Sequence, residues 1–108
     1  MFENERDNSN LRTDKKVGLL YEDLADLDYF ISGNFDASLA NYVNAVENYN
    51  DTPSIRYKIG YIQYSNENFA EALGSFIKAV NDKPSDKNLL LALGNTLTLR
   101  NSMSAAQG

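Results

Sequence analysis

Apolar residues recur along this chain at spacings of three and four residues, the period of one face of an α-helix. The pattern is interrupted at three places by residues of the kinds that end or begin helices. These are Gly33 with Asn34, Thr52 with Pro53, and Pro84. The pattern therefore predicts an all-α protein. The expected helices cover residues 16–32, 35–48, 53–65, 69–81 and 86–100, with a sixth helix opening in 101–108.

The first 14 residues differ from the rest, because they are polar and contain few apolar side chains. Such a segment gains little from burial, so residues 1–14 are predicted to form a mobile tail. Residues 15–108 are then predicted to form one helical domain.

A shift of 34 residues brings similar residues into register. Gly60 and Ala72 are small enough to let two helix axes approach, and Phe69 and Phe76 fill the space beside them. A fixed period between 20 and 50 residues is typical of a solenoid. The 34-residue shift pairs Phe69 with Phe35 and Met103, Phe76 with Tyr42, Ala79 with Ala45, and Gly60 with Gly94.

The succession of Gly60, Phe69, Ala72, Phe76, Ala79 and Pro84 resembles the tetratricopeptide repeat (TPR) family. The resemblance covers about two and a half repeats, at 16–50, 53–84 and, incomplete, 86–108. In the first copy, Asp26 and Ser38 replace the small glycine and alanine. The resemblance implies a solenoid of antiparallel helix pairs. Because a third repeat begins without room to finish, we expect a fragment of a longer array.

The composition of the chain limits the kinds of partner and of catalytic site that it could have. The net charge is −5, with ten acidic and four basic residues in 1–50 but five and six in 51–108. An acidic chain argues against a nucleic-acid partner, which needs clustered Lys and Arg. Cysteine and histidine are both absent, which removes zinc sites, thiol nucleophiles and histidine triads. No membrane partner and no cofactor are expected.

The sequence offers one set of side chains for an enzyme: the carboxylates of Glu22, Asp23, Asp26 and Asp28 could act as acid and base or hold a hard cation. No glycine-rich phosphate loop and no nucleophile with a base accompany them, so a solvated acidic face is favoured and no enzyme is predicted. Without an apolar run resembling a signal peptide or a membrane span, the predicted location is cytoplasmic. A fragment of an exported chain is the alternative.

The TPR resemblance implies a function in protein binding, as an adaptor or scaffold. In that family the first helices of successive repeats line a groove that takes a peptide or a helix of another protein. The most distinctive part of this groove is a row of three tyrosines at spacings of four and three, Tyr57, Tyr61 and Tyr64, which together form one continuous ridge. The same rings could instead simply pack between helices. The implied lining residues are Leu20, Asp23, Leu27, Phe30, Tyr57, Tyr61, Tyr64, Leu91, Asn95 and Thr98.

The alternative function is structural. Leucines at three successive positions, 89–91, cannot all face one way on a helix. A homodimer through the C-terminal helices would cover them, and the expected self-association residues are Leu89, Leu90, Leu93 and Leu97.

Overall fold

The computed structural model describes residues 2–107, and the side chains of 14–102. Within these residues all regular secondary structure is helical and no strand occurs, so the all-α prediction is confirmed. The elements are α1 (Phe2–Asp26), the π-helical segment η1 (Leu27–Ser32), α2 (Phe35–Glu47), α3 (Pro53–Ser65), α4 (Phe69–Asp82) and α5 (Lys87–Gln107).

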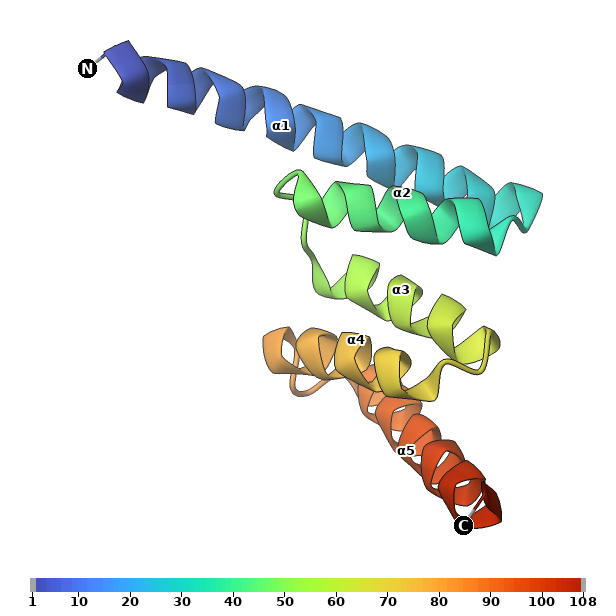
Figure 1. The fold of residues 1–108 in the computed structure, drawn as a ribbon. Helices are drawn as coiled ribbons and strands as arrows, with labels where there is room; N and C mark the ends of the chain where they lie inside the picture. Colours follow the sequence, from blue (N-terminus) through green and yellow to red (C-terminus); the bar gives the residue numbers. More distant parts are fainter. Residues whose placement is uncertain (1, 108) are drawn as a thin grey trace. The chain divides into compact units, whose positions relative to one another are not determined.

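The chain divides into two compact units, Met1–Asp51 and Thr52–Gly108, which we call unit 1 and unit 2. Unit 1 contains α1, η1 and α2, and unit 2 contains α3, α4 and α5. In both units, helices that follow one another in the sequence lie side by side (Figure 1).

Small residues set the contact between α1 and α2 in unit 1. Ala25 and Ser38 are both fully buried, and Ser38 Oγ donates a hydrogen bond to Ala25 O at 2.9 Å. A Cβ on Gly18 would lie 2.5 Å from Asn48 O, so only glycine permits this approach. Serine at position 38 therefore keeps the contact close and satisfies a carbonyl of the facing helix.

Tyr42 is the largest fully buried side chain of unit 1. Its hydroxyl donates to Asp26 Oδ1, and Asn41 Nδ2 donates to Asp28 Oδ2 at 3.1 Å. Burial raises the pKa of the Tyr42 phenol well above its usual value, and the bond to the Asp26 carboxylate adds to this shift. Two acidic side chains of the first hairpin thus have structural roles.

In unit 2, α3 and α4 also approach closely at a glycine. A Cβ on Gly60 would lie 2.6 Å from Cε1 of Phe76, whose ring is 1% exposed. Ala72 is fully buried beside it. Thr52 Oγ1 accepts from Ile55 N at 3.2 Å and Pro53 occupies the first turn, as the sequence predicted.

α5 packs against α4 and buries Leu89 and Thr96, two turns apart on one side of the helix. Gly94 occupies the position that corresponds to Gly60, yet a Cβ there would meet no atom within 4 Å. The side of α5 that contains Gly94 is therefore uncovered, whereas the same side of α3 is covered by α4.

Two predicted helix ends were wrong. α1 begins at Phe2 and not near Lys16, and α5 continues to Gln107 without the break expected after Arg100. Neither stretch contains proline or glycine, so neither contains a residue that breaks a helix outright. Gly33 does end the first helix, with φ 67°, but through a π-helical turn that the sequence did not indicate.

Candidate functional site

Two adjoining hollows in unit 2 form what we call the α3–α5 groove. They share Tyr57 and Asn88, and their volumes are about 250 and 330 Å³. The first is lined by Pro53, Ser54, Tyr57, Lys83, Asp86, Asn88 and Leu89, and the second by Tyr57, Tyr61, Tyr64, Phe76, Asn88, Leu91, Ala92 and Asn95.

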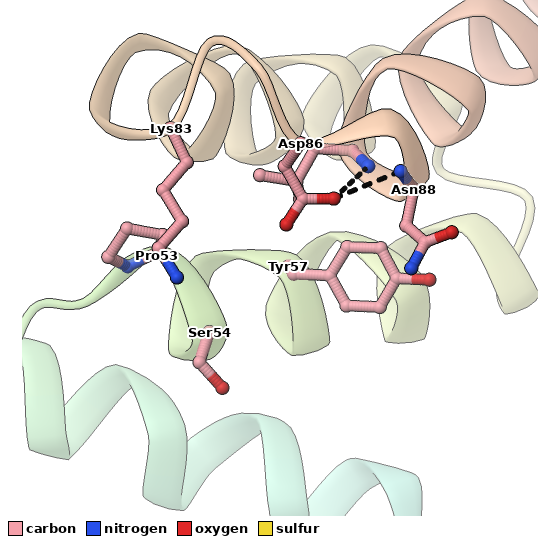
Figure 2. A pocket seen from close by; sticks show the side chains of 7 residues that line it. Pro53, Ser54, Tyr57, Lys83, Asp86 and Asn88 are labelled. Atoms are coloured by element: carbon pink, nitrogen blue, oxygen red, sulfur yellow. Dashed lines mark hydrogen bonds between the residues drawn. The ribbon is translucent and has the colours of Figure 1, made fainter.

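The first hollow has both polar and apolar lining residues and lies where the α4–α5 connection faces the start of α3. Asp86 Oδ1 accepts from the backbone N of Asn88 at 2.9 Å and of Leu89 at 3.3 Å, and so caps α5. Figure 2 shows the Lys83 side chain directed toward Pro53 and Ser54, with Tyr57 and Asn88 at the other end. This end of the groove thus offers one cation and several hydrogen-bonding groups.

Three stacked tyrosines form one wall of the second hollow. The ring centroids of Tyr57 and Tyr61 are 6.5 Å apart, and those of Tyr61 and Tyr64 are 6.4 Å apart, with interplanar angles of 26° and 20°. Phe76 of α4 also lines the hollow, and its centroid lies 5.8 Å from Tyr57. The row on α3 is therefore a continuous aromatic surface.

The three rings are not equivalent. Tyr57 contacts Phe76, and Tyr64 makes an edge contact with Phe69 at 5.6 Å, so both also stabilise the α3–α4 pair. Tyr61, between them, is 41% exposed. Tyr57 and Tyr64 therefore both pack on α4 and line the hollow, whereas Tyr61 is the most exposed ring of the row.

α5 supplies the opposite wall. Leu91 is 63% exposed, and Asn88 and Asn95 are exposed on either side of it along the helix. Thr98 does not line the groove; its Oγ1 donates to Gly94 O at 3.0 Å. The structure therefore brings together Tyr57, Tyr61, Tyr64, Leu91 and Asn95 of the predicted groove.

The predicted groove residues of the first repeat lie in unit 1. Asp23, Leu27 and Phe30 line an open hollow of about 430 Å³ together with Asp26 and Ile31. Leu20 is exposed outside it.

Of the predicted self-association residues, Leu89 must be corrected. It is 4% exposed because it lies on the side of α5 that faces the core of unit 2, so it offers no surface to a second chain. Leu93 is partly buried, while Leu90 and Leu97 are exposed.

Sequence reasoning missed several residues of the groove. Pro53, Ser54, Lys83, Asp86 and Phe76 line the groove but were not among the predicted groove residues. The short connection from Lys83 to Asp86 was the available signal, because it must return the chain beside the start of α3.

No group of three or more acidic side chains that could hold a metal ion occurs among the described side chains. Over the described residues, no helix combines the length and the apolar character that a bilayer crossing requires. No protein-family model, curated protein or solved structure matches the chain. Functional inference therefore depends on the groove and on the repeat pattern.

Proposed function

We propose that this chain is a TPR-type helical repeat whose α3–α5 groove binds a segment of another protein, so that the chain acts as an adaptor or scaffold. The observation that supports this proposal best is the aromatic wall of Tyr57, Tyr61 and Tyr64, which faces Leu91 and two amide side chains across a hollow of about 330 Å³. Tyrosine and exposed leucine offer apolar area, and amides offer hydrogen bonds.

The spacing of the helices supports the repeat itself. α2 and α4 begin at Phe35 and Phe69, and α3 and α5 begin at Pro53 and Lys87. Both offsets equal the period found in the sequence. α3 and α5 are thus equivalent first helices, and the groove lies between them.

The groove suits an extended segment of a few residues. Asn88 and Asn95 are seven residues apart on α5, which separates them by roughly 10.5 Å along the helix axis. An extended chain advances about 3.3 Å per residue, so a segment of roughly three residues spans the two amides. Its apolar side chains would cover Tyr61 and Leu91, and its backbone groups would pair with the amides.

A selection from a phage-displayed library of random peptides tests this function, followed by fluorescence anisotropy with the selected peptides. Tyr61→Ala and Asn95→Ala should each weaken binding about tenfold or more, which corresponds to about 1.4 kcal/mol and is typical of an interface anchor. Tyr49→Ala is the matched control, because Tyr49 is exposed but belongs to unit 1.

Tyr61 is preferred to its neighbours for this test, because Tyr57 and Tyr64 also pack on phenylalanines of α4. Circular dichroism should show that each variant keeps the helicity of the wild type. Peptides that bind Tyr61→Ala and Asn95→Ala as tightly as the wild type, or a selection that recovers no binder, would contradict the proposal.

A further inference from the structure

A row of apolar side chains lies on the side of the first helix opposite α2. Leu20, Leu24, Leu27 and Ile31 are between 50 and 78% exposed. Their spacings of four, three and four residues place them along one side of α1 and η1. The opposite side of α1 is covered, because Ala25 is fully buried against α2. We call the exposed residues the α1 row.

α5 carries a second uncovered apolar surface, which we call the α5 face: Leu90, Gly94 and Leu97. The two leucines are 46 and 43% exposed, and a Cβ on Gly94 would meet no atom within 4 Å. This surface is separate from the side of α5 that buries Leu89 and Thr96.

The equivalent side of α3 shows what covers such a surface. Gly60 and Gln63 precede Gly94 and Leu97 by 34 residues. The ring of Phe76 lies over Gly60, and Ser75 Oγ donates to Gln63 Oε1 at 2.7 Å, so a helix packs there. On α5 the glycine is retained, and the polar Gln63 is replaced by a leucine. The α5 face therefore keeps the small residue that lets a helix approach closely, and it has more apolar area to bury than the equivalent side of α3.

Charge decides which helix fits. Unit 1 has 11 acidic and 4 basic side chains, a net charge of −7, and unit 2 has 4 acidic and 6 basic, a net charge of +2. Asp23 is exposed beside the α1 row. α5 contains no acidic residue, and Lys87 and Arg100 lie toward the two ends of the α5 face. The two units that carry these surfaces therefore have net charges of opposite sign.

We propose that the α5 face of one copy of this chain docks on the α1 row of a second copy, head to tail. This arrangement covers both apolar surfaces with helices and pairs units of opposite charge. Pairing two α5 faces would bring together two basic helices, and pairing two α1 rows would bring together two units of net charge −7. Because the two surfaces differ, the contact is heterologous, and each added copy leaves one surface of each kind uncovered.

Complementation between two variants tests the head-to-tail contact. Leu24→Asp damages the α1 row and leaves the α5 face intact, and Leu97→Asp does the reverse. Ile77→Asp is the matched control, because Ile77 of α4 has a similar exposure of 46% and belongs to neither surface. Molecular mass is measured by light scattering over a range of concentrations, and circular dichroism is recorded for every variant.

The wild type and Ile77→Asp should increase in mass with concentration, less strongly at high salt because the charges are then screened. Leu24→Asp and Leu97→Asp should each remain single chains, and an equimolar mixture of them should form two-chain complexes and nothing larger. A wild type that stays monomeric, Leu24→Asp that dimerises alone through α5, or a mixture that stays monomeric would each overturn the proposal.

Discussion

Replacement of Gly60 by alanine tests the contact that organises unit 2. An added Cβ would lie 2.6 and 2.8 Å from Cε1 and Cδ1 of Phe76, closer than van der Waals contact permits. The ring is buried and has Tyr57 beside it, so it has little room to move. Alanine favours a helix over glycine by about 0.8–1.0 kcal/mol, whereas overpacking a core costs roughly 1–3 kcal/mol.

Gly74→Ala separates these two effects. Gly74 is an exposed residue of α4, and a Cβ there would meet no atom within 4 Å. It should therefore show the helix-propensity gain alone and stabilise the protein by about 1 kcal/mol. Gly60→Ala should lie roughly 1–3 kcal/mol below Gly74→Ala in unfolding free energy. A gap of that size corresponds to roughly 4 °C or more in Tm.

Urea denaturation followed by circular dichroism measures the difference. A double-mutant cycle with Phe76→Leu tests whether the clash with the Phe76 ring causes the loss of stability, because a smaller side chain leaves room for the new methyl group. Adding Gly60→Ala to Phe76→Leu should then cost less than adding it to the wild type, by about 1 kcal/mol. If Gly60→Ala stabilises the protein as much as Gly74→Ala does, the close approach of α3 and α4 described above is wrong.

Two further predictions concern single hydrogen bonds. An unfolded tyrosine ionises near pH 10, but burial keeps the Tyr42 phenol protonated to higher pH. Its contribution to stability is therefore complete below pH 10, and falls by up to about 1.4 kcal/mol for each pH unit above it. Tyr42→Phe should flatten the alkaline decline of Tm, while Tyr49→Phe, at an exposed position, should leave the decline unchanged. Thr52→Ala removes the side-chain acceptor of Ile55 N and should cost about 1 kcal/mol of unfolding free energy. Thr52→Ser keeps a hydroxyl acceptor and should retain most of the stability. An equal loss of unfolding free energy in both variants would contradict the capping role of Thr52.

The helices from Phe35 to Asp82 could be predicted closely, because their ends are marked by residues with a definite backbone effect. Thr52 and Pro53 open α3, and Asn34 Oδ1 accepts from Ala37 N at the start of α2. The outer ends carry no such marks. Residues 2–14 and 101–107 contain neither strong helix breakers nor a sufficient apolar face, so local propensity alone determines whether the helix continues.

The groove was predictable in part for a related reason. A repeat period places Tyr57 and Leu91 at equivalent positions of equivalent helices, so their meeting across one hollow follows from the spacing. The same period pairs Leu89 with Ile55, and both are buried, so the repeat also distinguishes Leu89 from the exposed Leu90 and Leu91. The π-helical turn at Leu27–Ser32, closed by a hydrogen bond from Gly33 N to Asp28 O, was not indicated by the apolar pattern.

The groove also shares residues with the core that supports it. Phe76 lies over Gly60 on one side and lines the second hollow on another, and Tyr57 contacts both this ring and the next tyrosine of the wall. A ligand that rests on Tyr57 therefore rests on the α3–α4 contact itself. Because a ligand that binds only the folded state stabilises it by about 2.7 kcal/mol at 100 times its Kd, occupancy of the groove and the integrity of the α3–α4 pair are thermodynamically coupled. Variants at Tyr57 should therefore change both quantities together, and we expect Tyr61, the most exposed of the three rings, to be the position at which binding can be separated from folding.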